Sequence, residues 1–343
     1  MFFTSDNAAG AAPEIMAAVQ RANHGYARSY GADGAMDRVR DRLRRVFEAP
    51  EAAVHLVATG TAANSLSLAL YCPPWGAVFA ETQAHIATDE CGAPEFFTSG
   101  AKLVPVQGVH GLITPAALAE ALGKVGDTGV HGVQRAMLSL TNVTEAGTVY
   151  SAAEVAALAA IARDLGLPVH LDGARFANAL VATGATPAQM TWKAGVDVLS
   201  FGGTKNGCLG VEAVVIFDPE KSWEFELRRK RAGHLFSKHR YLSAQMEAYL
   251  EGDLWLRLAA QANAMGARLA AGIAGIAGAS LCHPVHANML FPKWPPGTHE
   301  RIEAQGAAYY RMPATAGREA ARLVTSWSTS EADVDGLLAA LRG

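Results

Sequence analysis

The amino-acid sequence predicts an α/β fold, with a mainly parallel sheet covered by helices on both faces and a smaller α+β unit at the C-terminal end. Short apolar runs alternate with helical stretches over the first two thirds of the chain, which is typical of parallel sheets. These runs are rich in apolar residues, as in strands buried on both faces. The pattern then changes near residue 220, and 343 residues are enough for a second unit.

The expected elements follow one another in a regular order. Residues 1–12 are small and irregular and are expected to form an arm, followed by helices at about 13–23 and 36–47. The runs expected to form seven strands are 54–58, 77–80, 103–106, 136–140, 169–171, 196–201 and 213–217. Helices are expected between several of them, as at 152–165.

The last third of the sequence predicts the smaller unit. A long helical pattern covers about 242–276, strand-like pieces follow at 287–291 and 320–326, and a helix at 331–341 closes the chain. We therefore divide the chain into an arm (1–12), a large domain (13–240) and a small C-terminal domain (241–343), with the boundary near residue 240.

Composition excludes several functional classes. The formal net charge is −3, and the densest basic run, 38–45, is interleaved with apolar residues at helical spacing, which indicates a solvated helix face rather than a nucleic-acid surface. The four cysteines lie far apart, and neither disulfides nor a metal site is expected. No membrane span or signal peptide is visible, so we expect a cytoplasmic protein without membrane partners.

Three strand ends carry polar residues suited to chemistry. Asp172 ends one strand before a glycine, and Lys205 follows Gly202 and Gly203 after the next. An earlier strand leads through residues 59–61, Thr-Gly-Thr, into a helix, whose first turn can bind phosphate. Taken singly, these are an ordinary capping aspartate, a surface-turn lysine and a threonine helix cap.

Together, the three strand ends predict a pyridoxal phosphate pocket. A partly desolvated lysine can form a Schiff base with an aldehyde, which assigns Lys205 to the cofactor's aldehyde. Asp172 would keep the pyridine nitrogen protonated, and Gly60 with Thr61 would bind the phosphate. The glycine pattern of this segment matches neither the dinucleotide fingerprint nor the P-loop.

The chain resembles the L-threonine aldolases, within the fold-type-I β-eliminating lyases, over nearly its whole length. The most specific match is His-Leu-Asp-Gly-Ala-Arg at 170–175. Further matches are Ser5-Asp6, Tyr30-Gly31-x-Asp33, Thr59-Gly60-Thr61, Gln83-Ala84-His85-Ile86, Thr204-Lys205 and Arg322-Leu323-Val324-Thr325. The resemblance implies an aspartate aminotransferase-like fold with a mainly parallel seven-stranded sheet.

The resemblance also implies roles for individual residues. His85 would lie against the cofactor ring, and Thr204 and Arg175 would also contact the cofactor. Ser5, Arg175 and Arg322 would hold the substrate's α-carboxylate, which suits the paired donors of a guanidinium. Tyr30 would come from a neighbouring subunit, so the resemblance implies a homodimer or homotetramer with shared active sites.

Three departures from the family pattern bear on the catalytic base and the substrate side chain. Where many members read Asn-Thr-His, this chain reads Leu140-Thr141-Asn142, which leaves Asn142 in place of a histidine. Gly202-Gly203 precede Thr204 where Leu-Ser is commoner, and residues 237–240 replace an arginine in a glycine-rich turn. His85 then becomes the first candidate base, and His170 is expected to orient Asp172.

The resemblance implies a lyase that cleaves L-threonine, L-allo-threonine or related β-hydroxy-α-amino acids such as phenylserine to glycine and an aldehyde. The catalytic residues would be Lys205, His85 and Asp172. β-Elimination or transamination of a small amino acid remains the alternative, and a non-enzymatic ligand-binding protein on the same fold is disfavoured because the aspartate and the lysine are both present.

Overall fold

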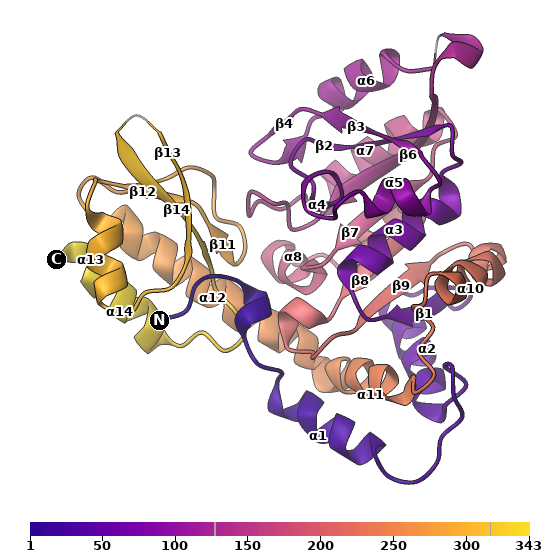
Figure 1. The fold of residues 1–343 in the computed structure, drawn as a ribbon, viewed down its shortest axis with the longest axis horizontal. Helices are drawn as coiled ribbons and strands as arrows, with labels where there is room; N and C mark the ends of the chain where they lie inside the picture. The colour runs from indigo at the N-terminus through magenta and orange to yellow at the C-terminus, as the bar shows by residue number, and fades with distance from the viewer. Residues whose placement is uncertain (127, 316) are drawn as a thin grey trace.

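The computed structural model describes residues 1–126, 128–315 and 317–343. It contains a large α/β unit and a smaller α+β unit, connected by the long helix α12 (Leu254–Ala274) (Figure 1). The predicted fold class is therefore confirmed.

The large unit is organised around one sheet of seven strands. In spatial order they are β1 (Ala53–Val57), β9 (Glu212–Ile216), β8 (Val198–Gly202), β7 (Val169–Gly173), β6 (Gln134–Thr141), β2 (Gly76–Glu81) and β3 (Lys102–Val106). Every predicted run forms one of these strands. The pairs from β8 through β3 are parallel, whereas β9 runs antiparallel to both β1 and β8.

Helices cover both faces of this sheet, because each strand carries apolar side chains on both sides. In β1, Val54 and Leu56 join one apolar cluster, whereas Ala53 and Val57 join another. The first cluster includes residues of α1 (Pro13–Ala22), α2 (Gly34–Val46), α6 (Pro115–Gly123), α7 (Ala152–Asp164) and α8 (Phe176–Thr183). The second includes residues of α3 (Gly60–Tyr71) and α10 (Ser222–Arg231).

Shorter elements complete the large unit. They are α4 (His85–Thr88), α5 (Ala93–Phe97), α9 (Pro187–Met190) and the two-stranded ribbon of β4 (Gly108–Val109) and β5 (Leu112–Ile113). The short α4 follows β2 and so lies at the carboxyl edge of the sheet, where the neighbouring strands β7 and β8 also end.

The small unit is an antiparallel sheet with two helices and the N-terminal arm. Its strands are β10 (Ser280–Leu281), β12 (Pro292–Trp294), β14 (Arg318–Val324), β11 (Met289–Leu290) and β13 (Tyr310–Thr315), and its helices are α13 (Thr298–Ala304) and α14 (Glu331–Arg342). Phe3 of the arm is fully buried in this core, and its backbone bonds with Ala308 and Val324. The arm thus joins the small unit before the chain enters α1 (Figure 1).

The predicted helix at 242–276 is wrong in one respect, because it is broken. The structure has α11 (Arg240–Tyr249) and then α12, separated by Gly252 and Asp253, which adopt φ angles of 53° and 55°. A left-handed glycine ends a helix at little steric cost, and this signal was overlooked in the sequence.

The packing of these two helices bears on the domain boundary. Met246 and Tyr249 of α11, and Ala259 of α12, belong to the core of the large unit, whereas Leu269 and Ile273 belong to that of the small unit. We propose that the large unit continues through α11 into the first half of α12, beyond the boundary expected near residue 240.

Candidate active site

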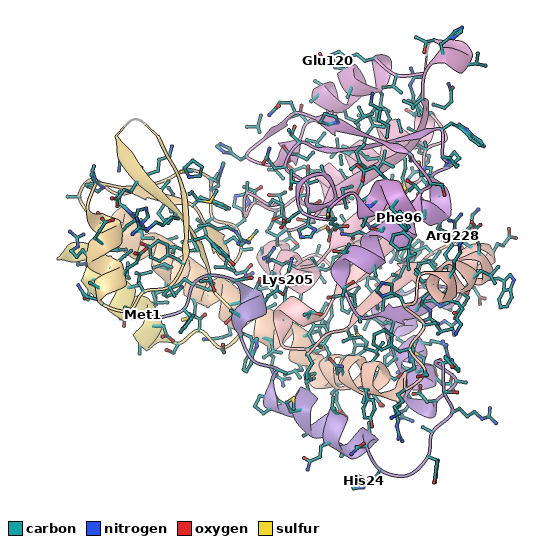
Figure 2. All side chains as sticks on the ribbon, in the orientation of Figure 1. Met1, His24, Phe96, Glu120, Lys205 and Arg228 are labelled. Carbon is teal, nitrogen blue, oxygen red and sulfur yellow. The ribbon has the colours of Figure 1, made fainter. Side chains whose placement is uncertain are left out.

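A cavity of about 380 Å³ lies where the carboxyl ends of the parallel strands meet the turns that follow them. Its lining residues are Asn7, Ala58, Thr59, Gly60, Thr61, Asn64, His85, Asp89, Glu145, Asp172, Ala174, Thr204, Lys205 and Glu212. The cavity therefore brings together six of the predicted site residues, Gly60, Thr61, His85, Asp172, Thr204 and Lys205. Figure 2 shows Lys205 in the middle of the molecule, near the junction of the two units.

Asp172, next to the last residue of β7, is held by two hydrogen bonds. Asn64 Nδ2 donates to its Oδ2 at 2.9 Å, and the Ala174 backbone N–H donates to its Oδ1 at 3.0 Å. His170, which we expected to orient Asp172, is instead paired with Ser139 and Ser200 at 2.9 and 3.0 Å. Burial lowers the pKa of His170 to about 4, so this ring is neutral and packs beneath the site.

Lys205 sits in a tight turn directly after β8. A Cβ on Gly202 would lie 2.3 Å from the Ala174 carbonyl oxygen, so only glycine lets the turn carrying Lys205 approach the one after Asp172. Within the described residues the Lys205 amine makes no hydrogen bond or ion pair. It is therefore available to a ligand in the cavity.

Glu212, at the start of β9, supports the lysine turn and was missed in the sequence. Its Oε2 accepts from the Gly203 N–H at 2.7 Å, and burial raises its pKa to about 7. Because β9 is antiparallel to β8, the beginning of β9 lies beside the end of β8, with Glu212 opposite Gly202. Sequence reasoning that treats all strands as parallel does not place this carboxyl in the site.

The start of α3, where a phosphate-binding site was predicted, lines the cavity. Thr59 caps the helix by accepting from the Ala62 N–H at 3.2 Å. Gly60 and Thr61, in the first turn of this helix, line the cavity, and first-turn amides lack intrahelical partners. No atom lies within 4 Å of a Cβ placed on Gly60, so there is room for a group beside this backbone. Backbone donors and open space together suit a phosphate.

His85 begins α4 and is paired with two carboxylates. Its Nδ1 lies 2.7 Å from Glu90 Oε1, and its Nε2 lies 3.5 Å from Asp89 Oδ2. The hydrogen bond with Glu90 raises the pKa of His85. The imidazole is therefore fixed in orientation, and it keeps its proton to higher pH than a free histidine would.

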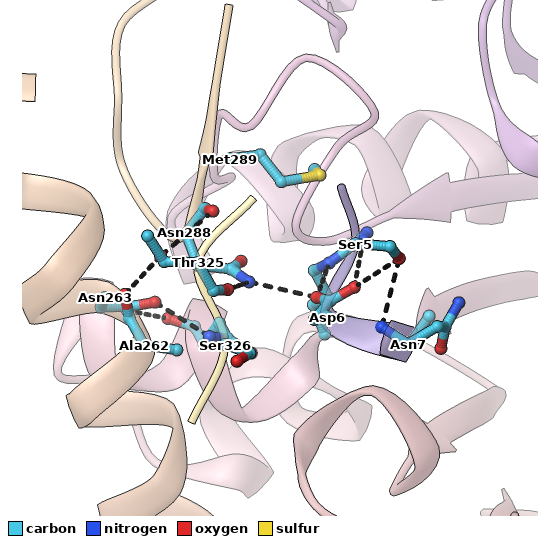
Figure 3. A network of polar contacts seen from close by, with 12 residues as sticks. Ser5, Asp6, Asn7, Ala262, Asn263, Asn288, Met289, Thr325 and Ser326 are labelled. Carbon is cyan, nitrogen blue, oxygen red and sulfur yellow. Dashed lines mark hydrogen bonds and ion pairs between the residues drawn. The ribbon is translucent and has the colours of Figure 1, made fainter. Parts of the chain in front are cut away.

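The residues expected to hold a carboxylate lie just outside the cavity lining. Arg175 is fully buried and forms a bidentate pair with Asp6 at 2.6 and 2.9 Å. Asn288 of the small unit also donates to Asp6 at 3.1 Å (Figure 3). Ser5 accepts from the Asn7 N–H at 3.1 Å within the arm. Through Asp6, this part of the arm is tied both to the turn after β7 and to the small unit.

Arg322 and Tyr30 are placed differently from each other. Arg322 is partly buried in β14, with Nη2 3.6 Å from the Met289 sulfur, and burial and the charge of Arg175 lower its pKa. Tyr30 is 49% exposed, does not line the cavity and is covered by the Lys230 ammonium at 4.8 Å. The chain therefore does not bring its own Tyr30 to its own Lys205.

Asn142 does not line the cavity. Its side chain is fully buried, accepts from the Tyr150 N–H and donates to the Tyr150 carbonyl, both at 3.1 Å. Both amide atoms are thus used to tie the end of β6 to the following segment. Glu145, three residues later, does line the cavity, and sequence reasoning missed it.

The donor set fits pyridoxal phosphate. An unpaired amine suits its aldehyde, a buried carboxylate suits its ring nitrogen, and a capped helix start suits its phosphate, all in one cavity. Among the described residues no group of three or more His, Cys, Asp and Glu side chains is arranged to hold a metal ion.

Comparison with known proteins agrees with this site. A family model described as beta-eliminating lyase matches residues 3–294. The chain belongs to the beta-eliminating lyase family. It is 42% identical over 340 residues to a low specificity L-threonine aldolase of Pseudomonas sp. (strain NCIMB 10558), covering 99% of this chain and 96% of that protein.

Solved structures of similar proteins confirm the fold. A threonine aldolase of Leishmania major superposes with a TM-score of 0.94 at 30% identity, covering 99% of this chain and 98% of that one. An aspartate aminotransferase of Rhodobacter sphaeroides superposes with a TM-score of 0.69 at 19% identity, covering 100% and 90%, and this likeness concerns the fold alone. The family resemblance and the aminotransferase-like fold predicted from the sequence are both confirmed.

Proposed function

We propose that this beta-eliminating lyase-family protein is a pyridoxal phosphate-dependent aldehyde-lyase of the threonine aldolase type. It cleaves L-threonine, L-allo-threonine or related β-hydroxy-α-amino acids such as phenylserine to glycine and an aldehyde. The observation that carries the proposal is the single cavity lined by the Lys205 amine, the Asp172 carboxylate and the start of α3. The 42% identity to a low specificity L-threonine aldolase favours aldol cleavage over other reactions of the fold.

Each site residue has a separate role in the proposed reaction. Bound pyridoxal phosphate supplies an electron sink for the pair released when the substrate's Cα–Cβ bond breaks. Asp172 holds a proton at the ring nitrogen, and Lys205 binds the aldehyde and carries protons to and from the substrate side. Arg175, oriented by Asp6, and Arg322 supply positive charge for the α-carboxylate, which fixes the bond to be broken in one orientation.

His85 is the proposed acceptor of the β-hydroxyl proton. Because the hydrogen bond with Glu90 raises its pKa, the neutral form that can accept a proton is gained at higher pH than for a free histidine. Cleavage through His85 should therefore rise with pH through this pKa. Replacing His85 by Asn should slow cleavage much more than it weakens cofactor binding, whereas equal losses would indicate that the ring only stacks on the cofactor.

The cofactor assignment is tested by Lys205→Ala. The variant should lose both turnover and the visible absorption band that the protein gains with pyridoxal phosphate. Lys193→Ala is the matched control, because Lys193 is a surface residue paired with Glu48 and does not line the cavity. Full activity in Lys205→Ala would refute the proposal.

The reaction type is tested by the products. Glycine with an aldehyde supports aldol cleavage, pyruvate with ammonia indicates β-elimination, and a keto acid indicates transamination. Threonine, allo-threonine, phenylserine and hydroxyaspartate isomers, assayed side by side, define the preferred side chain.

We also propose that the protein is a homodimer or homotetramer in which Tyr30 completes the active site of a neighbouring subunit. Support comes from the exposed Tyr30 ring, which lies away from its own chain's cavity. Mixing inactive Tyr30→Ala and Lys205→Ala subunits tests this proposal. Half of randomly formed dimers would be mixed, with one intact site of two, so about a quarter of the wild-type activity should return. No recovery after subunit exchange would place Tyr30 in its own subunit's site.

We also propose a cytoplasmic location for this protein. All four cysteines are free thiols, as expected in a reducing compartment. No helix among the described residues is long and apolar enough to cross a membrane. Fractionation of the native host would test the location.

A further inference from the structure

Four side chains of the site form a continuous chain of hydrogen bonds beneath the cavity. Asn64 Nδ2 donates both to Asp172 Oδ2 and to Glu90 Oε1, each at 2.9 Å. The same Glu90 oxygen lies 2.7 Å from His85 Nδ1. Asn64, Glu90 and Asp172 are at most 5% exposed, so water does not replace these contacts. One amide thus links the group proposed at the cofactor's ring nitrogen with the one proposed at its face.

Two buried side-chain atoms in this hydrogen-bond network have no partner among the described residues. They are Asn64 Oδ1 and Glu90 Oε2. Buried polar atoms are normally satisfied, and exceptions concentrate where a site's chemistry requires the arrangement. Among the described residues, the side-chain hydrogen bonds of Asn64 and Glu90 lead only to Asp172, to His85 or to each other. This geometry points to a role in the reaction.

The shared oxygen has a definite electrostatic consequence. His85 and Asn64 both bond Glu90 Oε1, so they compete for its negative charge, and each weakens the other's hydrogen bond. Asn64 is uncharged, and its amide nitrogen donates to the carboxyl groups of Glu90 and Asp172 on either side of it. An aspartate at position 64 would instead have no proton to donate to either carboxylate.

We propose that Asn64 and Glu90 are positioning residues that couple His85 to Asp172, so that the side chains at the cofactor's face and at its ring nitrogen are oriented and charged together. This inference rests on the proposed function for its catalytic meaning. Neither residue touches the substrate in this account: Glu90 acts through His85, and Asn64 acts through Glu90 and Asp172.

The coupling predicts shifts of opposite sign at His85, measured in the cofactor-free protein by NMR of the histidine Cε1–H with pH. Glu90→Gln should lower the pKa of His85, because an uncharged amide replaces the carboxylate that favours imidazolium. Asn64→Leu should raise it further, because Glu90 Oε1 then accepts from His85 alone. The other charges facing His85, Asp89, Asp172 and Lys205, are retained in both variants. If the substitutions only loosened the site, the pKa of His85 would approach that of a free histidine in both variants.

The second readout is cofactor affinity, from titration of the visible band. Asn64→Leu should weaken binding about tenfold or more, the equivalent of one hydrogen bond to a charged group lost at Asp172. Glu90→Gln should change affinity less, because Asp172 keeps its donor. Asn64→Ala replaces the leucine variant if that one does not fold.

Asn178→Leu is the matched control. Asn178 is as buried as Asn64, but its amide bonds Asn263 of α12, outside the cavity. This variant should change neither readout. The coupling would be overturned if Glu90→Gln and Asn64→Leu shifted the pKa of His85 in the same direction. It would also be overturned if Asn64→Leu changed only one of the two readouts, the pKa of His85 or the cofactor affinity. Failure of the proposed function would appear separately, as absence of glycine and aldehyde from the wild-type enzyme.

Discussion

The buried pair of Asp6 with Arg175 is predicted to hold the N-terminal arm against the active site. Asp6→Asn removes one charge of a bidentate pair in which both side chains are at most 3% exposed. Burial alone would raise the pKa of Asp6, but the charge of Arg175 and its hydrogen bonds lower it overall. Because the folded-state pKa is lowered, the pair stabilises the protein at neutral pH, and this contribution is lost as the pH falls through that pKa.

The magnitude follows from the burial of Arg175. Removing one partner of a buried ion pair leaves an uncompensated charge and costs about 3–5 kcal/mol. Asn keeps one acceptor for the guanidinium, so we expect about 3 kcal/mol, which is a large fraction of the about 5–15 kcal/mol of a typical domain. KM for the amino acid should also rise, because Arg175 is no longer held in one orientation.

The assay is urea unfolding of the cofactor-free protein at pH 7, with Asp37→Asn as the matched control. Asp37 pairs with Arg40 at 2.9 Å, but its side chain is 68% exposed. The same chemical change should therefore cost less than about 1 kcal/mol there. Equal costs for the two variants would refute the reasoning, since burial would then contribute nothing. The difference between the variants should also vanish when the measurement is repeated in strong acid.

Three further predictions concern other parts of the chain. Burial raises the pKa of Glu212 from 4.5 to about 7, so the folded protein keeps a proton that the unfolded chain releases. The free energy of unfolding of the wild-type protein should therefore fall as the pH rises from 5 to 8. Across this window, Glu212→Gln should gain up to about 3 kcal/mol in stability relative to wild type, measured by urea unfolding. A stability difference that stays constant with pH would contradict this. Gly147→Ala should cost about 2–4 kcal/mol, because φ is +80° and the new Cβ would lie 2.6 Å from a carbonyl oxygen, whereas Gly25→Ala, at φ +62° in open space, should cost about 1 kcal/mol by thermal unfolding; similar losses would exclude the clash. Asn142→Ala should lower stability by about 2–4 kcal/mol, by leaving the Tyr150 N–H and carbonyl unpaired, with kcat of the folded enzyme nearly unchanged; a large loss of kcat alone would instead assign Asn142 to the chemistry.

Site residues that lie at the end of a strand or at the start of a helix could be predicted from the sequence. Asp172 lies at the end of one apolar strand and Lys205 follows the next, and parallel strands end at one edge of a sheet, so strand order alone brings them to one cavity. The same argument placed Gly60 and Thr61 at a helix start. Local signals decide such features, because the strand, the turn and the helix cap each lie within a few residues of one another.

The sequence by itself therefore determined the fold class, the family and the residues at the ends of the parallel strands. Only the tertiary structure decided the partners of those residues. Asn64 lies inside an apolar helix and meets Asp172, 108 residues later in the chain. Glu212 meets the backbone of Gly203 because β9 runs antiparallel to its neighbour β8. Asp6, 169 residues from Arg175, meets it only because the arm folds back along the small unit. Such contacts depend on the relative placement of distant elements, which no local pattern encodes.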